Sequence, residues 1–119
     1  MKEQEHNLQV VCVRWFRLQY PKHIIFAIPN GGQRNVVVAA KMKAEGVLAG
    51  VPDLFMPHPT KWYKGLFIEM KNGSKGRVSA AQMQLMMQLK RLDYACAVVR
   101  DFDEFKYTIE LYLTGGLLV

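Results

Sequence analysis

A chain of 119 residues, half of them hydrophobic, is long enough to form one domain with its own core. This composition excludes collagen-like and disordered chains, and it predicts a single domain over residues 1–119. Sixteen Lys and Arg residues against ten Asp and Glu give a net charge of +6, which favours a polyanionic partner such as nucleic acid. The basic excess lies before residue 101, because residues 101–119 hold four acidic residues and one basic residue.

The two cysteines, Cys12 and Cys96, lie in apolar surroundings without the spacing of a zinc site, which predicts buried thiols in a reducing compartment. No apolar run approaches the roughly 18 residues of a membrane span, and no leader-like run follows the charged N-terminus. We therefore expect a cytoplasmic protein of a bacterium or of a phage-infected host cell. Neither a membrane nor a small-molecule cofactor is expected among its partners.

The first half of the chain predicts a helix, a strand and a second helix. Apolar residues at helical spacing predict an amphipathic helix over residues 3–19 that ends before Pro21, with these residues on its apolar stripe: Leu8, Val11, Cys12, Trp15 and Leu18. The apolar run 24–28 predicts a buried strand. A helix over residues 35–45 follows and ends at Gly46.

The second half predicts two neighbouring antiparallel strands, over residues 53–56 and 65–71, separated by a turn-rich segment. Ser79 and Gln82 have the spacing of a capping box that opens a helix to about Leu92. A short strand over residues 94–99 and an amphipathic helix after it complete the order α-β-α-β-β-α-β-α. This pattern predicts an α/β fold with a mixed β-sheet flanked by helices.

The strand over residues 65–71 carries the clearest chemical signal. Because side chains alternate across a strand, Phe67, Glu69 and Lys71 share one face. One interpretation is that this carboxylate and this ammonium, at the end of an apolar strand, form only a structural ion pair.

Asp53 adds a second carboxylate, because an antiparallel return of the chain brings the start of its strand beside Glu69. Two carboxylates converging beside a lysine suit a cation, and Mg²⁺ prefers hard oxygen ligands. We therefore expect Asp53, Glu69 and the backbone carbonyl of Met70 to hold Mg²⁺ or Mn²⁺, as one or two ions. Lys71 would orient or deprotonate a water molecule that attacks a phosphodiester.

The sequence from Pro52-Asp53 to Glu69-Met70-Lys71 resembles the PD-(D/E)XK nuclease signature, in a setting similar to the VRR-NUC branch of that superfamily. Four further segments, in the family's order, support the resemblance: residues 5–9, 29–34, 46–54 and 79–82. The resemblance implies a restriction-endonuclease-like fold and metal-dependent cleavage of DNA. Small stand-alone members of this branch form homodimers and cut four-way (Holliday) junctions, whereas longer relatives act on flapped DNA.

By this resemblance, Asp53 and Glu69 match the metal-binding carboxylates, Lys71 matches the catalytic lysine, and Glu5 completes the metal site. Helical spacing allows Glu5 to face the sheet, because Glu5, Gln9, Cys12 and Phe16 fall on one side of the first helix. Gln82 matches a family glutamine near the site, or it only closes the capping box. Gln9 braces Glu5 by hydrogen bonding, or it is an ordinary helix residue.

Four further groups of residues have two interpretations each. Asn30, Gly31, Gly32 and Arg34 form a tight turn, or they admit the DNA backbone with Arg34 on a phosphate. Lys75 and Arg77 lie in a glycine-rich loop and track DNA near the cut, or they form a solvated surface. Trp62 and Tyr63 stack on an unpaired base or pack on a partner, and Met83 and Met87 fill the core or form a dimer interface.

Together these features predict a metal-dependent, structure-selective DNA endonuclease that acts as a homodimer on four-way junctions or other branched DNA. The main alternative is a non-catalytic basic module that binds nucleic acid, in which Glu69 and Lys71 form only an ion pair. A nickase-type or tRNA-splicing relative would differ in substrate and not in site. Dependence of cleavage on a divalent metal separates the nuclease from the binding module.

Overall fold

The computed structural model describes residues 2–29 and 35–118 and contains one four-stranded mixed sheet flanked by helices. The strands are β1 (Phe26–Ala27), β2 (Leu54–Met56), β3 (Leu66–Met70) and β4 (Ala95–Val99). The helices are α1 (Lys2–Gln19), α2 (Val36–Ala44), α3 (Ala80–Arg91) and α4 (Phe102–Leu113), with a short 3₁₀ helix η1 (Gly73–Lys75) after β3. The predicted α/β class and order of elements are confirmed.

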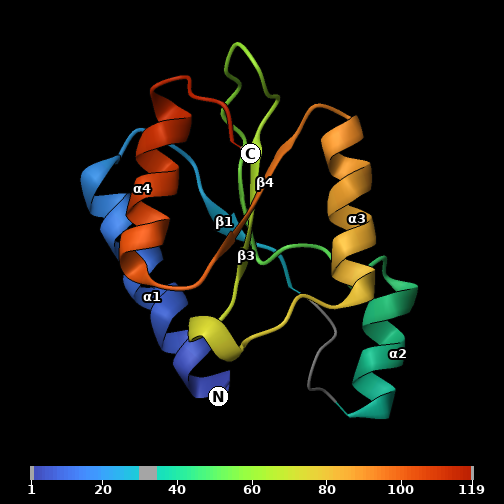
Figure 1. Ribbon diagram of the computed structural model, residues 1–119. Coiled ribbons are helices and arrows are strands. Elements are labelled where there is room, and N and C mark those ends of the chain that lie inside the picture. Colours follow the sequence, from blue (N-terminus) through green and yellow to red (C-terminus); the bar gives the residue numbers. More distant parts are fainter. Residues whose placement is uncertain (1, 30–34, 119) are drawn as a thin grey trace.

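Two helices cover one face of the sheet and one covers the other. In Figure 1, α1 and α4 lie together on the left of the sheet and α3 lies on the right. The core lies between the sheet and the α1–α4 layer, where these side chains are fully buried: Cys12, Phe16, Leu66, Ile68, Phe105, Ile109 and Tyr112. This layer therefore holds the sheet rigidly from one side.

The apolar stripe of α1 differs from the one expected. Val11 and Leu18 are 52% and 78% exposed, whereas Cys12 and Phe16 are completely buried. The inward stripe follows Cys12 and Phe16, four residues apart, and Val11 lies about 100° of helical rotation away from Cys12. The side of α1 that includes Glu5 and Gln9 is therefore the side that faces the sheet.

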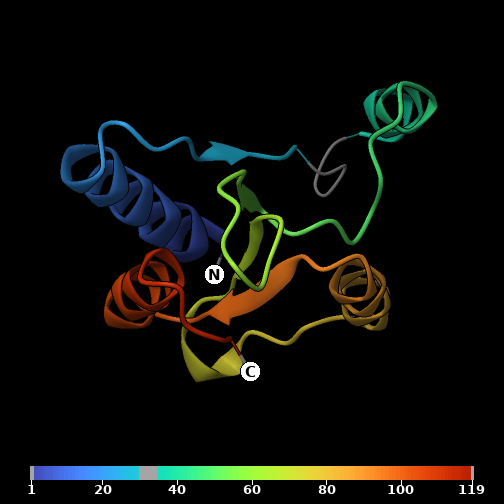
Figure 2. The same ribbon diagram turned by 90° about the horizontal axis from the view of Figure 1, so that it is seen from above.

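The buried strand expected over residues 24–28 is wrong in extent and in burial. β1 spans only Phe26 and Ala27, both exposed, and of this segment only Ile25 is buried. The physical reason is position, because β1 is the edge of the sheet and pairs only with β2. Figure 2 shows α2 near this edge, on the same side of the sheet as α3, and no residue within Val36–Ala44 is buried.

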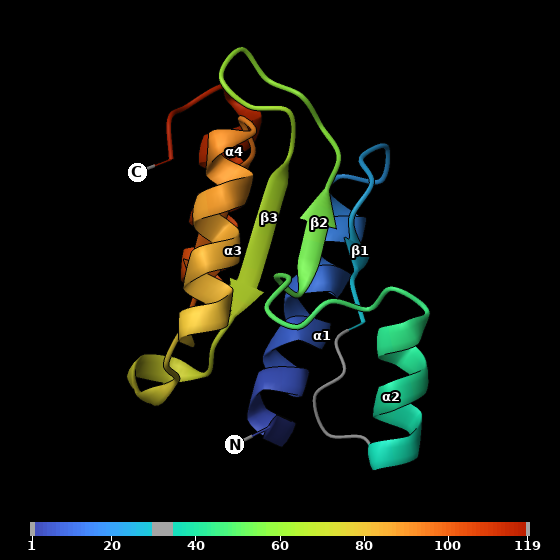
Figure 3. The ribbon, with the colours of Figure 1, turned by 90° about the vertical axis from the view of Figure 1, so that its right-hand side faces the viewer.

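The register of the strands places two acidic residues opposite one another. β2 and β3 are antiparallel, with Leu54 opposite Ile68, so the next pair, just before the start of β2, is Asp53 and Glu69. β3 and β4 are parallel, with Met70 opposite Val99, and the N–H of Lys71 donates to the carbonyl of Val99 at 2.9 Å. In Figure 3 the start of β2, the end of β3, η1 and the first turns of α1 and α3 all lie toward the lower end.

Among the helices of residues 2–29 and 35–118, none has both the length and the apolar character needed to cross a membrane.

Candidate active site

Glu69 is the centre of the candidate site. Its residue exposure is 3%, and its Oε2 accepts hydrogen bonds from Lys71 Nζ at 3.2 Å and from Gln82 Nε2 at 2.9 Å. Its Oε1 is buried and has no hydrogen-bond partner within the described part of the chain. The ion pair expected from strand alternation is therefore present, but it uses only one of the two carboxylate oxygens.

Asp53 is held between two strands. Its side-chain Oδ2 accepts a hydrogen bond from the N–H of Met70 at 2.8 Å, and its backbone carbonyl accepts one from the N–H of Ile28 at 2.8 Å. The backbone of Met70 thus fixes the Asp53 carboxylate at the end of β3. This brings Asp53 and Glu69 together, as the antiparallel return of the chain predicts.

Both carboxylates are harder to ionise than usual. Burial and, to a smaller extent, the charge of Asp53 together raise the pKa of Glu69 from 4.5 to about 7, although Lys71 acts to lower it. Burial is also the main cause of the raised pKa of Asp53, which the Met70 N–H and Lys71 lower and the charge of Glu5 raises. The two groups repel each other as anions, and a bound cation would relieve this repulsion.

Gln82 has both of the roles that the sequence left open. Its Oε1 accepts a hydrogen bond from the N–H of Ser79, and its N–H donates to Ser79 Oγ, so the capping box is complete. Its Nε2 then donates to Glu69. One amide side chain therefore closes the first turn of α3 and holds the central carboxylate.

Gly50 explains how α3 reaches the site. Gly50 has φ +94°, and a Cβ atom there would lie 3.0 Å from the backbone oxygen of Ala81 in the first turn of α3. A larger residue would be strained and would push the segment before Asp53 away from this helix. The close approach keeps Asp53 and Gln82 at the same end of the sheet.

Glu5 and Gln9 lie on the sheet-facing side of α1 and are half-buried. The charge of Glu5 acts on Asp53, yet within residues 2–29 and 35–118 no three His, Cys, Asp or Glu side chains converge closely enough to hold a metal ion. Glu5 therefore does not complete a three-carboxylate set in this structure. No hydrogen bond joins Gln9 to Glu5 among the described residues, whereas Gln4 Oε1 accepts one from Asn72 Nδ2 at 2.6 Å.

The site fits a divalent cation through two carboxylates. Asp53 and Glu69 supply hard oxygen donors, and the buried, unpartnered Oε1 of Glu69 is the kind of atom that a missing ligand would satisfy. Mg²⁺ and Mn²⁺ commonly keep several water ligands, so two carboxylates and a backbone carbonyl such as that of Met70 are sufficient.

Some of the residues predicted to bind DNA are placed and others are not. Lys75 lies in η1 and Arg77 lies two residues later, and both are exposed just beyond the carboxylates. Asn30, Gly31, Gly32 and Arg34 lie outside the described residues. Arg100 was not predicted to lie at the site. Its guanidinium binds the loop that carries Lys75, and the parallel register that sets Arg100 beside Lys71 is the signal that could have revealed it.

Tyr63 packs inside the chain, whereas Trp62, Met83 and Met87 are exposed. The ring of Tyr63 stacks on Tyr112 at 5.9 Å, and its hydroxyl bonds to both backbone groups of Leu118, so Tyr63 packs within its own chain. Trp62 is 46% exposed, with Lys61 Nζ 5.1 Å from its ring centroid. Met83 and Met87 are 53% and 50% exposed and do not fill the core.

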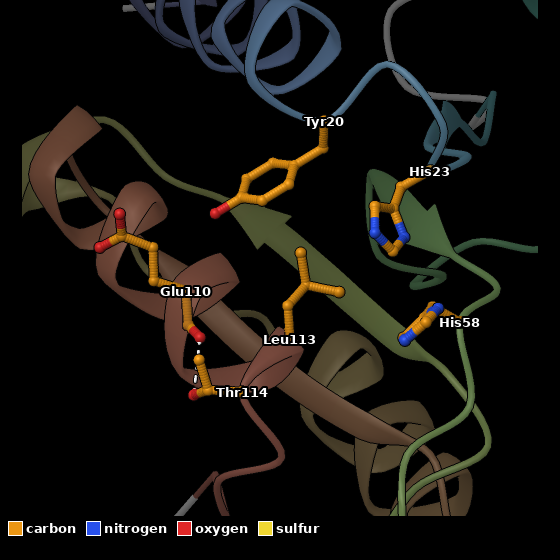
Figure 4. Close-up of a pocket in the computed structure, with 6 residues that line it drawn as sticks. All are labelled: Tyr20, His23, His58, Glu110, Leu113 and Thr114. Atoms are coloured by element: carbon orange, nitrogen blue, oxygen red, sulfur yellow. Dashed lines mark hydrogen bonds between the residues drawn. The ribbon is translucent and has the colours of Figure 1, made fainter.

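A pocket lies at the opposite end of the sheet, lined by Tyr20, His23, His58, Glu110, Leu113 and Thr114 (Figure 4). The rings of His23 and His58 are 4.8 Å apart at their centroids, and burial together with His23 lowers the pKa of His58. The two histidines are 35 positions apart in the sequence, and no spacing signal pairs them. The pocket contains none of the predicted site residues.

Comparison with known proteins is consistent with this geometry. The family model of the VRR-NUC domain matches residues 1–102. A solved structure described as a VRR_NUC domain protein is 29% identical and superposes with a TM-score of 0.82, and the match covers 95% of this chain and 90% of that chain. No curated protein sequence matches the chain significantly.

Proposed function

Because the chain belongs to the VRR-NUC family of nuclease domains, we propose that it is a metal-dependent endonuclease that hydrolyses phosphodiester bonds in branched DNA. The observation that carries this proposal is Glu69. It is buried, its pKa is raised to about 7 by burial and by Asp53, and it keeps one oxygen without a partner. A carboxylate in this state is typical of a ligand-binding or catalytic position.

Asp53, Glu69 and the Met70 carbonyl would hold one or two Mg²⁺ or Mn²⁺ ions, with Glu5 as a nearby negative charge. When bound, such an ion supplies a Lewis acid that neutralises charge on the scissile phosphate and activates water. The protein contributes a rigid donor set, because the Met70 N–H fixes Asp53 and the Gln82 amide fixes Glu69.

Lys71 would orient the attacking water and donate a hydrogen bond to it. Its side chain is only 12% exposed, and its Nζ lies 3.2 Å from Glu69 Oε2, so the ammonium is held beside the carboxylates. Lys75 and Arg77 would bind backbone phosphates near the cut, which positions DNA without reading its sequence.

Selectivity for branched DNA would come from a homodimer that presents two sites at a fixed separation, so that the shape of a junction is read. The half-exposed methionines Met83 and Met87, one helical turn apart on α3, support this helix as part of the dimer interface, because contiguous apolar surface is typical of protein–protein contacts. Light scattering tests this part directly. A species of 13.7 kDa, the mass of one chain, would contradict the dimer.

Cleavage assays test the activity. Labelled four-way junctions, flaps and linear duplexes are incubated with the wild type, Lys71→Ala or Asp53→Ala, in Mg²⁺, Mn²⁺ or EDTA. We expect cleavage of branched DNA by the wild type with metal only, and normal cleavage by Lys106→Ala, which removes an exposed lysine on α4. Binding without cleavage under any metal would instead identify a non-catalytic nucleic-acid-binding module.

A further inference from the structure

Arg100, the first residue after β4, closes the loop that follows Lys71. Its guanidinium nitrogen Nη1 donates to the carbonyls of Gly73 at 2.9 Å and of Gly76 at 2.5 Å. Its own carbonyl accepts a hydrogen bond from the N–H of Gly73 at 3.2 Å. Three hydrogen bonds thus fasten residues 73–76 to the end of β4.

Gly76 transmits this attachment to Lys71. Gly76 is buried, and a Cβ atom there would lie 3.0 Å from Cβ and 3.3 Å from Cδ of Lys71. The backbone of Gly76 therefore packs closely against the aliphatic part of the Lys71 side chain. The carbonyl of this same residue is the one that Arg100 holds.

The guanidinium of Arg100 is engaged with neutral acceptors. Within residues 3–29 and 35–118, Lys71 and Glu69 form the one ion pair closer than 4.0 Å, and Arg100 takes no part in it. Glu104 accepts from the backbone N–H of Arg100 and not from its side chain. Arg100 lies beside the site, but its planar guanidinium serves to hold two backbone carbonyls in place and not to form an ion pair.

We propose that Arg100 is a positioning residue for Lys71: by holding the carbonyls of Gly73 and Gly76 it keeps the loop against the lysine stem, and so keeps Nζ beside Glu69. This inference rests on the proposed function for its effect on cleavage. Its effect on the placement of Lys71 is independent of any activity.

The first test measures that placement directly. An amine-reactive reagent labels the folded protein without metal, and peptide mass spectrometry follows the labelling rate of Lys71 relative to exposed Lys106. We expect several-fold faster labelling of Lys71 in Arg100→Ala and faster labelling in Arg100→Lys, which keeps the charge but not the guanidinium fork. Arg14→Ala, which removes an exposed arginine on α1, should label as the wild type does.

Unchanged labelling in Arg100→Ala would overturn the proposal, as would full restoration by Arg100→Lys, because charge alone would then suffice. Circular dichroism ensures that folded protein is compared. Where Arg100→Ala does not fold, Arg100→Lys alone decides the test, because it keeps the charge and removes the guanidinium that holds the carbonyls of Gly73 and Gly76.

The second test separates positioning from DNA binding. In Arg100→Ala, single-turnover cleavage at saturating DNA should fall about tenfold or more, as for other residues that orient a ligand or catalytic group. The affinity for DNA in EDTA, and its salt dependence, should stay unchanged. A salt slope lower by about one charge, with a normal rate at saturation, would instead identify a phosphate contact and overturn the proposal.

The two tests also distinguish the failure of this inference from the failure of the proposed function. If the wild type cuts no DNA, the proposed function fails, while the labelling of Lys71 still decides whether Arg100 positions it. If Lys71 becomes reactive in Arg100→Ala but cleavage by that variant is normal, the positioning role in catalysis is overturned.

Discussion

The two ends of the sheet treat buried polar groups differently. At the His58 end, the Tyr112 hydroxyl donates to the His58 carbonyl at 2.6 Å, and the Tyr63 hydroxyl bonds to the backbone of Leu118. At the Lys71 end, Glu69 keeps an oxygen without a partner and a raised pKa that burial causes. At the His58 end the protein itself satisfies these hydroxyl groups, whereas the unsatisfied oxygen of Glu69 supports the ligand site proposed at the Lys71 end.

The pocket also lies apart from the unsatisfied carboxylate. It lies at the His58 end, where hydroxyl groups already bond to the backbone, whereas the carboxylates lie at the other end. The proposed site therefore does not coincide with this pocket. It is supported by the charges and the unsatisfied hydrogen-bonding capacity of Asp53 and Glu69.

The largest expected effect is the loss of cleavage in Asp53→Asn, which changes only the end of the sheet that holds Lys71. The amide oxygen can still accept the Met70 N–H, so the fold should persist while a negative ligand is lost. We expect the rate to fall about 100-fold or more in single-turnover assays with Mg²⁺. Asp103→Asn, an exposed change on α4, is the control. A normal rate in Asp53→Asn would remove Asp53 from the site.

The next effect is on stability and concerns Glu69→Gln without metal. The pKa of Glu69 in the folded protein, about 7, lies above its usual value of 4.5, so the folded wild type should lose stability as pH rises from about 4.5 to 7. The Gln variant lacks this loss. Its free energy of unfolding minus that of the wild type should therefore be larger at pH 8 than at pH 4 by about 2–3 kcal/mol.

Urea unfolding at a series of pH values in EDTA measures this difference. Glu45→Gln, which changes an exposed glutamate, should follow the wild type. In the wild type at pH 8, added Mn²⁺ should raise the melting temperature, and in Glu69→Gln it should raise it much less. Parallel pH profiles for the wild type and Glu69→Gln would contradict the raised pKa.

A smaller effect separates the two roles of Gln82. Ser79→Ala removes the cap alone and should cost about 1 kcal/mol of stability with little change in rate. Gln82→Ala keeps the backbone N–H that Ser79 caps, but it removes the side-chain acceptor of the Ser79 N–H and the bond to Glu69, and it should also slow cleavage by about tenfold. Thermal melts and single-turnover rates on both variants test this. Equal rates in the two variants would restrict Gln82 to its capping role.

The smallest expected effect comes from a substitution at the end of the sheet that holds His58. Tyr112→Phe leaves the His58 carbonyl without its donor and should cost about 1 kcal/mol of unfolding free energy, with an unchanged cleavage rate. Tyr107→Phe, at a tyrosine that is 66% exposed, is the matched control and should have no effect on stability. A loss of cleavage in folded Tyr112→Phe would show that the two ends are coupled.

Local patterns in the sequence predicted much of this arrangement. Strand alternation predicted that Glu69 and Lys71 share a face, and the antiparallel return predicted that Asp53 lies beside them. The Ser79–Gln82 spacing predicted the capping box. Each of these inferences depends on residues close in the chain, or on the pairing of two consecutive strands.

What could not be predicted depends on distant packing. The exposure of β1 follows from its place at the edge of the sheet, which an apolar run alone does not specify. The role of Arg100 depends on the path of a loop 24 to 27 residues earlier in the chain. The position of Glu5 depends on the angle at which α1 crosses the sheet, so helical periodicity gave its side of the helix but not its distance from Asp53.

The shared use of the Gln82 side chain couples local unfolding to the site. The first turn of α3 cannot fray without breaking the bonds between Ser79 and Gln82, and the same motion withdraws the amide from Glu69. The amide protons of Ser79 and Gln82 therefore exchange with solvent through a single opening event. Any ligand that binds Glu69 in its native position slows that exchange, so the helix terminus reports on occupancy of the carboxylates.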